Sequence, residues 1–363
     1  MDDAARRRQL AQQALADGLF RDCSWCVFTD SGIQELDCVG QEPVNALYDL
    51  ASVTKVFTAT AVLGVTKAQR LSLDAPLGSF GLPDLLGSQI SRQRFAQLTL
   101  RKLLTHTSGI QAWYPFYADG RPFWTIMTER LEAPPVIGMV YSDLNYILLR
   151  EVLCLLTGLA YPKVMERYVS QPLKLRPLCY APLPNLPVAP GSMDNQIEEG
   201  MCRDRNMRFN GFRPHDTMVR GQPNDGNTYY YFHGVSGHAG LFGNVKSVAG
   251  LGQFYLTTQD PWYTQALQPQ PECEGRCLGF HTGAPFPTGC GHTGFAGTSL
   301  WVDRQHGFGM VILANRLMGG GPSGPNLNPF RLAMHQTMLK TGELDHGTES
   351  DSHGTAQPTN GAH

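Results

Sequence analysis

Hydrophobic and polar positions near the start of the chain predict one helix followed by a hairpin. Apolar residues recur at helical spacing in the first twenty positions: Leu10, Ala14, Leu15 and Leu19. Two strand-like stretches follow, Trp25–Thr29 and Ile33–Val39, and the turn residues at 30–32 predict that they pair. A second apolar helix is predicted from Ser52 to Leu63.

In the rest of the chain the predicted secondary structure changes twice, first to helices and then back to strands. Between about residues 71 and 231 the pattern predicts mostly helices separated by Pro- and Gly-bearing loops, including Leu100–Leu104, Leu144–Leu156 and Val164–Val169. From Gly234 onward it predicts strands at Leu278–His281, Thr298–Val302 and Gly309–Leu313, then a closing helix at Pro329–Leu339. Strands at both ends therefore enclose a helical middle.

This order of elements predicts an α+β fold with one antiparallel sheet built from both chain ends, flanked by helices, and an inserted helical lobe. We expect a discontinuous sheet domain at 1–63 and 232–342 and a helical domain at 64–231, with a cleft between them. Residues 343–363 are polar and lack the apolar side chains that would offset the entropy of ordering, so we expect a disordered tail.

Composition and charge limit the classes of partner that the chain is expected to bind. The 363 residues carry a formal net charge of −2, without a basic stripe for nucleic acid, so we expect a small-molecule or peptide substrate. No apolar run is long enough for a membrane span, and the N-terminus lacks the apolar core of a signal peptide. We expect a cytoplasmic protein, or a periplasmic or secreted one if a leader has been removed; the oligomeric state stays open.

Cysteine and histidine do not form a convincing metal site. The nine cysteines are odd in number and scattered, which favours buried thiols. Cys23 and Cys26 fall on a predicted strand, where an odd separation sends them to opposite faces. Cys273 and Cys277 lie in a loop without a second ligand pair, and the candidate histidines lack an acidic cluster: His233, His238, His281 and His292. We expect no metal and no cofactor.

Candidate chemistry begins at Ser52 and Lys55, an S-x-x-K that opens a helix. A spacing of three puts both side chains on one face about a turn apart, so the lysine can reach the hydroxyl. The helix N-terminus adds N–H groups and partial positive charge where an oxyanion would form. Alone this motif is weak, because an ordinary first helical turn gives the same letters. The nucleophile elbow G-x-S-x-G is absent, which disfavours an α/β-hydrolase triad.

Two further elements strengthen the case. Tyr141-Ser142-Asp143 lies where a loop leads into an apolar helix, so the phenol of Tyr141 can face a cleft. The alternative is that Tyr141 is a packed aromatic residue and Asp143 caps the helix. His292-Thr293-Gly294-Phe295 precedes a predicted strand, and small residues on an edge strand let a substrate backbone lie close.

These three elements, in this order, resemble the motifs of the penicillin-recognising serine hydrolases, in the form seen in class C β-lactamases and related esterases and peptidases. Supporting segments are similar too: Asp49-Leu50-Ala51, Leu103–Gly109 and Gly237–Phe242. The resemblance covers about residues 15 to 340 and implies a β-lactamase/transpeptidase-like fold.

The resemblance implies a role for each site residue. Ser52 would attack the carbonyl, with Lys55 and Tyr141 handling its proton, and Asp143 would orient Lys55 or the substrate. The N–H groups of Ser52 and Phe295 would form the oxyanion hole. His292 and Thr293, followed by Gly294, would line the wall that receives a substrate carboxylate or amide.

Two departures from the family pattern shape the expected activity. Asp143 stands where many members carry Asn, and its charge favours a protonated Lys55, which leaves Tyr141 as the expected proton carrier. His292 stands where true β-lactamases and carboxypeptidases usually carry Lys, and histidine is mostly neutral near pH 7. We therefore expect ester or amide hydrolysis rather than efficient β-lactam turnover.

Two functions remain open at this point. The first is an acyl-serine hydrolase acting on a small ester, amide or D-amino-acid peptide. The second is a binding or sensor protein of the same fold with little turnover, or a weak β-lactamase. We expect the loops Trp113–Trp124 and Met201–Tyr231 to govern specificity.

Overall fold

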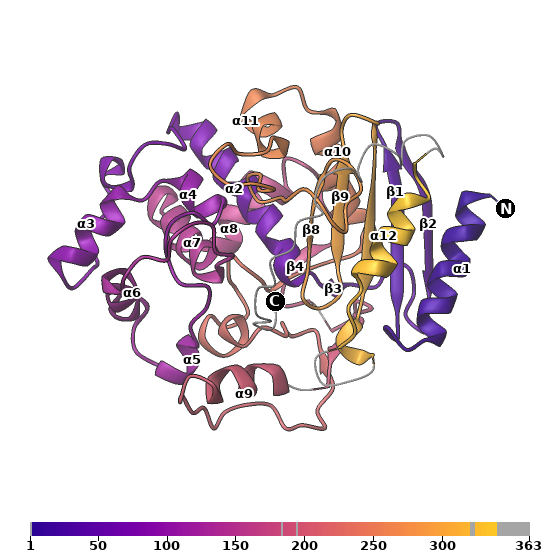
Figure 1. Cartoon of the computed structure of the whole chain (residues 1–363), viewed down its shortest axis with the longest axis horizontal. Coiled ribbons are helices and arrows are strands. Elements are labelled where there is room, and N and C mark those ends of the chain that lie inside the picture. The colour runs from indigo at the N-terminus through magenta and orange to yellow at the C-terminus, as the bar shows by residue number, and fades with distance from the viewer. Residues whose placement is uncertain (1, 183, 194, 320–323, 340–363) are drawn as a thin grey trace, which may run out of the picture.

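The computed structural model describes residues 2–182, 184–193, 195–319 and 324–339. The expected tail at 343–363 lies outside these residues. A five-stranded antiparallel sheet in the order β2-β1-β10-β9-β8 forms one side of the molecule (Figure 1). Its strands are β1 (Cys23–Thr29), β2 (Gly32–Val39), β8 (Cys290–Thr293), β9 (Ser299–Asp303) and β10 (Phe308–Ala314).

Both ends of the chain contribute to this sheet, as predicted. The hairpin β1–β2 joins the C-terminal strands because β1 pairs with β10, placing Trp25 opposite Ile312. Both faces of β1 are buried. Trp25 packs into the core under helices α1 (Asp3–Ala16) and α12 (Asn328–Gln336), while Phe28 belongs to the larger core on the opposite face. Cys23 and Cys26 lie in these two different cores, which confirms the expected opposite faces.

Helix α10 (Val245–Thr257) covers the second face of the sheet and packs on β1, β9 and β10. It approaches closely because it carries glycine where it crosses the sheet. A Cβ at Gly252 would lie 2.2 Å from the ring of Phe28. Small residues at such a crossing let helix and sheet backbones pack without a void.

The helical lobe is organised around α2 (Thr54–Gln69), whose residues 54–66 are all buried. It packs against α7 (Asp143–Thr157) (Figure 1). The other helices are α3 (Gln89–Gln97), α4 (Leu100–Leu104), α5 (Phe116–Asp119), α6 (Phe123–Glu132), α8 (Tyr161–Met165), α9 (Gln196–Arg203) and α11 (Pro261–Thr264). Short 3-10 or π turns occur at Ala51–Val53, Leu77–Phe80, Glu166–Ser170, Asn227–Tyr231, Gln265–Leu267 and Arg316–Met318.

Two small sheets hold the segments that border the site. One has the order β3-β7-β4, from Tyr48–Asp49, Leu241–Gly243 and Leu178–Tyr180; the other pairs β5 (Pro190–Ser192) with β6 (Val219–Arg220). Pairing of β3 with β7 brings the strand before Ser52 against the segment after His238. Residues from three distant parts of the chain therefore meet beside the start of α2.

One predicted strand is wrong. Leu278–His281 forms a loop with isolated bridges, in which His281 exchanges both backbone hydrogen bonds with Gly291. Gly279 has φ +82°, a left-handed conformation that interrupts an extended run, and its α-carbon faces Ala59 of α2 so closely that an added Cβ would lie 2.4 Å from the alanine methyl. The apolar residues there are buried by helix contact, not by strand pairing.

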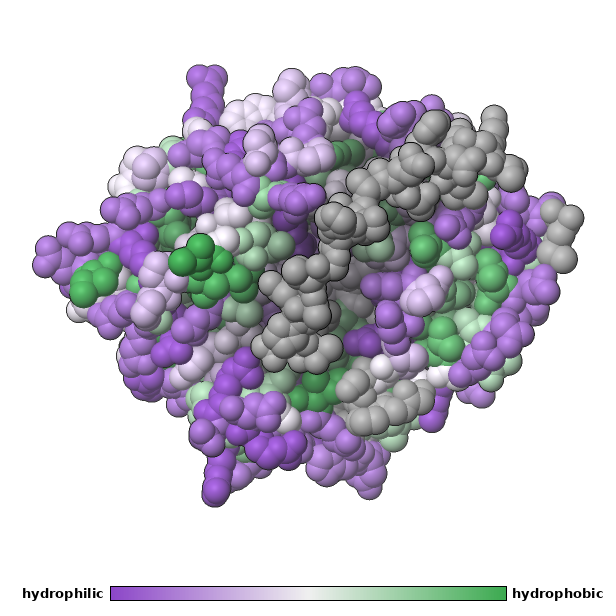
Figure 2. All heavy atoms as spheres, viewed as in Figure 1, coloured by the Kyte–Doolittle hydropathy of each residue, from purple (hydrophilic) through white to green (hydrophobic). Residues whose placement is uncertain are grey.

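The surface facing the viewer in Figure 2 is mostly hydrophilic, with small, separate apolar groups. Within the described residues, no single helix is long and apolar enough to cross a bilayer. One bent pair, Asp143–Thr157 with Tyr161–Ser170, meets that test by length and composition only.

Candidate active site

Ser52 sits in the 3-10 turn Ala51–Val53, directly between β3 and α2. The turn is unusual because Ala51 has φ 45°, a conformation that L-residues rarely adopt. Asp49 supports it by accepting a hydrogen bond from the N–H of Ala51 at 2.9 Å, while its other oxygen accepts one from the N–H of Asn224 at 2.8 Å. The serine is thus presented by a strained turn that a buried carboxyl group holds in place.

Lys55 is fully buried beneath Ser52, and three oxygen atoms surround its Nζ. The Oγ of Ser52 lies at 2.9 Å and the carbonyl oxygen of His238 at 3.2 Å, and both accept hydrogen bonds from Nζ. The carboxylate of Asp143 lies at 2.7 Å. An ammonium group has three N–H donors and no acceptor, so these three contacts fit its protonated form.

The electrostatics of Lys55 agree with that assignment. Burial alone lowers the pKa of Lys55, but the Asp143 carboxylate and the Tyr141 phenol favour the charged form more strongly, so this pKa lies above the ordinary lysine value. A lysine that remains charged cannot accept the proton of Ser52. The proton has to go to another group.

Tyr141 lines the same cavity as Ser52. The Nζ of Lys55 lies 4.9 Å from the centre of its ring, and the guanidinium carbon of Arg276 lies 5.4 Å from the same point. Two cations close to one phenol lower the energy of negative charge that develops there during a reaction. The ring of His106 packs against Tyr141 with the centroids 4.6 Å apart.

His106 also fixes the backbone at this point. Its Nδ1 accepts a hydrogen bond from the N–H of Ser142 at 3.0 Å, and burial lowers the pKa of His106 well below its ordinary value. A neutral imidazole is the form that can accept this bond. Asp143 is the first residue of α7, after Ser142, and its carboxylate pairs with Lys55 instead of capping the helix. The alternative cap function is therefore not what the geometry shows.

Strand β8 provides the opposite wall. The end of this strand approaches the Ser52 turn closely, since a Cβ at Gly294 would lie 2.7 Å from the carbonyl oxygen of Leu50. The Nδ1 of His292 lies 2.8 Å from the carbonyl oxygen of Thr293. Burial lowers the pKa of His292 well below its ordinary value, so the ring is neutral at pH 7 and cannot act as a fixed cation.

The structure brings the predicted site residues together. Seven of them line one cavity of about 730 Å³: Ser52, Tyr141, Asp143, His292, Thr293, Gly294 and Phe295. Lys55 lies beneath its floor. The two loops expected to govern specificity also reach this cavity, through Trp113 and Met201.

Sequence reasoning missed Arg276, which lines the same cavity. Its guanidinium makes no ion pair and no hydrogen bond with any residue that the structure describes, although it is half-buried. A guanidinium in this state is suited to a planar anion such as a carboxylate. It lies in a loop of turn residues without a strand or helix pattern, so no local signal marked it.

A second missed group is the pair His238 and Asp225. The Nε2 of His238 lies 2.9 Å from Asp225, and its Nδ1 lies 2.8 Å from the hydroxyl of Ser236. Ser236 is completely buried, so this serine–histidine–aspartate arrangement has no exposed nucleophile. This arrangement contacts the candidate site through the carbonyl oxygen of His238, which accepts a hydrogen bond from Lys55. The sequence placed His238 in a family-like segment but did not link it to Asp225.

Acidic groups gather on this side of the cavity. Potential ligand atoms of Asp143, Asp225 and His238 lie within 4.8 Å of one another, but each already has a partner in the network above. Burial alone would raise the pKa of Asp225, but His238 and hydrogen bonds from Thr228 bring it to about 2. Burial and the Asp225 charge raise the pKa of Glu198 to about 8.

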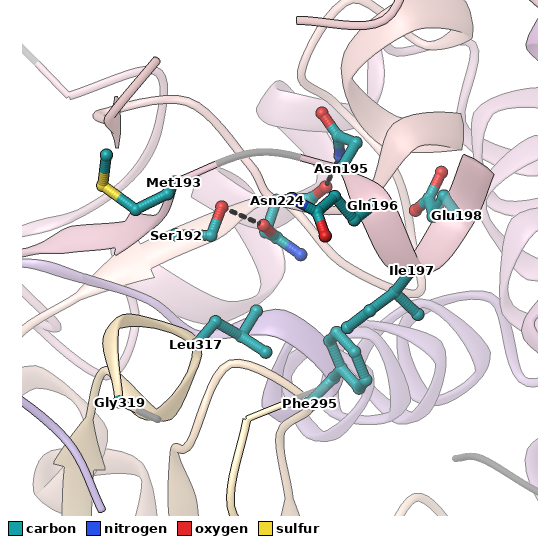
Figure 3. A pocket seen from close by; sticks show the side chains of 10 residues that line it. All are labelled: Ser192, Met193, Asn195, Gln196, Ile197, Glu198, Asn224, Phe295, Leu317 and Gly319. Atoms are coloured by element: carbon teal, nitrogen blue, oxygen red, sulfur yellow. Dashed lines mark hydrogen bonds between the residues drawn. The ribbon is translucent and has the colours of Figure 1, made fainter. Parts of the chain in front are cut away.

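A smaller cavity of about 360 Å³ adjoins the first (Figure 3). Four residues line both spaces: Ile197, Glu198, Asn224 and Phe295. Ser52 lines the larger of these two adjoining cavities. The residues of this larger cavity could carry acyl transfer, with a buried ammonium beside the hydroxyl, a phenol between two cations, and an edge strand opposite.

A family model described as Beta-lactamase matches residues 9–331 of the chain. Similar proteins from Salmonella typhimurium and Salmonella heidelberg bear the name "Putative D-alanyl-D-alanine carboxypeptidase". Each is 26% identical over 319 residues, a span of 78% of this chain and 72% of the relative.

Solved structures share the fold. The octameric penicillin-binding protein homologue from Pyrococcus abyssi aligns over 91% of this chain and 76% of its own, at 17% identity and TM-score 0.61. EstCE1, a hydrolase with promiscuous acyltransferase activity, aligns over 92% and 98% at 19% identity and TM-score 0.64. A D-stereospecific amidohydrolase from Streptomyces sp. aligns over 87% and 95% at 19% identity and TM-score 0.61.

Proposed function

Since this chain belongs to the beta-lactamase family, we propose that it is a serine hydrolase that forms an acyl-enzyme at Ser52 on a small ester, amide or D-amino-acid peptide. The observation that carries the proposal is the arrangement around Lys55. Its ammonium contacts the Ser52 hydroxyl at 2.9 Å while Asp143 holds it charged from 2.7 Å. This geometry orients the serine oxygen and supplies positive charge to the reacting centre.

The proposed reaction has two halves. In acylation, the Oγ of Ser52 attacks the carbonyl carbon and its proton passes to the phenolic oxygen of Tyr141, while the proton of that phenol passes to the leaving group as the acyl bond to it breaks. In deacylation, water attacks the ester carbonyl carbon and gives a proton to the Tyr141 oxygen, and the phenol proton passes to the Oγ of Ser52 as the bond between Oγ and the acyl carbon breaks and the acid leaves. The N–H groups of Ser52 and Phe295 would bind the oxyanion.

Arg276 bears on the substrate class. His292 is neutral where a fixed cation would bind a substrate carboxylate, and Arg276 places in the same cavity a guanidinium that has no ion pair or hydrogen bond among the described residues. We propose that this guanidinium binds a carboxylate on the leaving portion of a peptide or amide. Substituting Arg276→Gln is expected to reduce kcat/KM more than tenfold for substrates with that carboxylate and to affect their neutral methyl esters less.

The proposal is tested by labelling and turnover. The protein is incubated with a fluorophosphonate probe, a p-nitrophenyl ester, a chromogenic cephalosporin and a fluorescent penicillin, and the labelled peptide is mapped by mass spectrometry. We expect labelling at Ser52, ester turnover that Ser52→Ala abolishes, and slow cephalosporin turnover. The exposed Ser31→Ala serves as the matched control. Hydrolysis that persists in Ser52→Ala would assign the activity to another residue, and a protein that binds but does not turn over would favour the sensor function.

A further inference from the structure

Cys277 and Cys290 form a pair of buried thiols behind the wall of the larger cavity. Both residues belong to the main hydrophobic core, at 1% and 2% exposure. The thiol of Cys290 donates a hydrogen bond to the sulfur of Cys277, and the thiol of Cys277 donates one to the carbonyl oxygen of Leu267 at 3.6 Å. The two sulfur atoms are therefore neighbours, and the proposed hydrolytic mechanism uses neither of them.

The backbone places this pair directly behind Arg276. His281 bridges to Arg276 on one side and to Gly291 on the other, so these three residues lie in one row across three chain segments. Adjacent positions in such an extended pairing point to opposite faces. Arg276 and His281 line the cavity. Cys277 and Cys290 are the next residues along the chain from this row, and both lie in the core. A change at the thiols therefore reaches Arg276 through one peptide bond.

Cys277 has the properties of an attacking thiol. The hydrogen bond from Cys290 lowers the pKa of Cys277, burial opposes this, and the charge of Arg276 adds to the lowering. The structure describes all nine cysteines, and the pKa of each of the other eight is raised. The thiolate is the form that reacts with peroxides, and a second cysteine beside it converts the first product to a disulfide.

We propose that Cys277 and Cys290 are a redox modification site, at which a peroxide converts the two thiols to a disulfide that ties the loop of Arg276 to strand β8. With hydrogen peroxide, the Cys277 thiolate attacks one oxygen, the O–O bond breaks, and the departing hydroxide takes up the thiol proton to give water. Cys290 then attacks the sulfur of the resulting sulfenic acid, the S–O bond breaks, and hydroxide leaves with the Cys290 proton as a second water. The two sulfur atoms are oxidised and the peroxide is reduced.

The disulfide is expected to move the loop more than the strand. It holds its sulfur atoms at about 2.05 Å, closer than any non-bonded contact between them. Strand β8 pairs with β9 at each of its four residues, whereas the loop beside it has only isolated bridges. The loop therefore moves toward the strand and carries Arg276 with it. If Arg276 binds a substrate carboxylate, a point that rests on the proposed function, oxidation weakens that contact.

Tryptic mapping of the oxidised protein tests the site itself. The protein is treated with hydrogen peroxide, its remaining thiols are alkylated in denaturant, and it is digested without reductant. Trypsin cuts directly before Cys277, so this residue and Cys290 fall on one peptide, 277–304, whereas Cys273 falls on peptide 247–276. We expect peptide 277–304 to lose two hydrogen atoms and both alkylation sites, and dithiothreitol to restore them. Two alkylated cysteines, added oxygen without a disulfide, or a link between the two peptides would overturn the proposal.

Variants identify the partners. Cys290→Ser should abolish the disulfide and leave Cys277 as a sulfenic acid that dimedone traps. Cys273→Ser is the matched control, because Cys273 is also buried in this loop, and disulfide formation should be unchanged in it. A disulfide that survives in Cys290→Ser, or one that disappears in Cys273→Ser, would overturn the assignment of the pair.

Kinetics test the link to Arg276 separately. A substrate with a carboxylate on its leaving portion and its neutral methyl ester are compared on reduced and oxidised protein. We expect oxidation to lower kcat/KM more than about fivefold for the first and less than about twofold for the second, because small displacements of a positioning group are costly. Dithiothreitol should reverse the loss, and Cys290→Ser should not show it.

The two measurements fail independently. A mapped disulfide with an unchanged ratio of kcat/KM values would overturn the link to Arg276. A mapped disulfide in a protein that hydrolyses neither substrate would support the modification site while the catalytic proposal fails.

Discussion

In the mechanism that we propose, Lys55 supplies a fixed positive charge and Tyr141 transfers the proton. Lys55 contacts three oxygen atoms and its pKa is raised, so we propose that the Tyr141 phenol, not Lys55, relays the serine proton. Sequence alone suggested this division from Asp143. The structure adds the distances and the second cation, Arg276.

Replacing Tyr141 with phenylalanine removes the proposed proton carrier but keeps the ring beside its two cations. We expect kcat/KM for ester hydrolysis to fall at least about 100-fold, the usual size of a general-base contribution. Tyr168→Phe is the control, because the hydroxyl of Tyr168 makes no hydrogen bond among the described residues. Retained activity in Tyr141→Phe would move the proton transfer to Lys55.

Replacing Asp143 with asparagine tests the charge of Lys55. The carboxylate raises the pKa of Lys55, so Asp143→Asn should lower it, and Lys55 should lose its proton at a lower pH than in the wild type. Loss of a partner at such a distance shifts a pKa by about 1 to 3 units. We expect the alkaline limb of the kcat/KM profile, measured from pH 6 to 11, to move to lower pH.

An unmoved alkaline limb in Asp143→Asn would show that activity does not depend on the Lys55 ammonium. Asp17→Asn, on an exposed residue at the end of α1, is the control for general changes in charge.

Among the elements, strand β8 and the turn that carries Ser52 depend on one close contact. A methyl group at Gly294 would lie 2.1 Å from the Oγ1 of Thr298, which itself donates a hydrogen bond to Leu50. Sequence predicted glycine here for substrate approach. The structure shows that it also allows the strand to reach the nucleophile turn.

Gly294→Ala should therefore push the strand away from Ser52. We expect a loss of about 1 to 3 kcal/mol in stability, the usual range for overpacking, and a more than tenfold loss in kcat/KM. Thermal unfolding and ester kinetics measure the two. Gly87→Ala is the control, since its methyl group would meet only Thr128 at 3.6 Å. Wild-type kinetics in Gly294→Ala would show that this contact does not position the strand.

Elements with strong local patterns were predictable, whereas the loop beside the site was not. The hairpin β1–β2 combines strand-forming runs with turn residues, so local preference and tertiary packing agree. Residues 278–281 are equally apolar, but their burial comes from α2 and their path from the left-handed Gly279. Periodicity cannot separate these two origins of an apolar run.

At the scale of the whole molecule, the buried carboxyl group of Glu198 in the cavity makes the stability of the fold depend on pH. Glu198 is buried with a pKa of about 8, above its ordinary value near 4.5. A group with a raised folded-state pKa contributes stability below its unfolded value and loses that contribution as pH rises through its folded value. The folded protein should therefore lose stability between about pH 5 and 8 through Glu198.

Glu198→Gln keeps the acceptor for the N–H of Gly226 but cannot ionise. At pH 8 we expect it to be more stable than the wild type by at least about 1 kcal/mol, since one pKa unit corresponds to 1.4 kcal/mol, with little difference at pH 5. Urea unfolding at both pH values gives the comparison, and the exposed Glu132→Gln is the control. Parallel pH curves for wild type and Glu198→Gln would contradict this assignment.

Periodicity in the sequence predicted the sheet shared by both chain ends, because strand and helix patterns are local. The residues around Ser52 were predicted from the resemblance of three short motifs to a known family. Tertiary structure decided what surrounds them. Arg276 and the His238–Asp225 pair come from loops far apart in the chain. Their meeting depends on the packing of strands and helices that no local pattern encodes, so their chemistry became visible only in three dimensions.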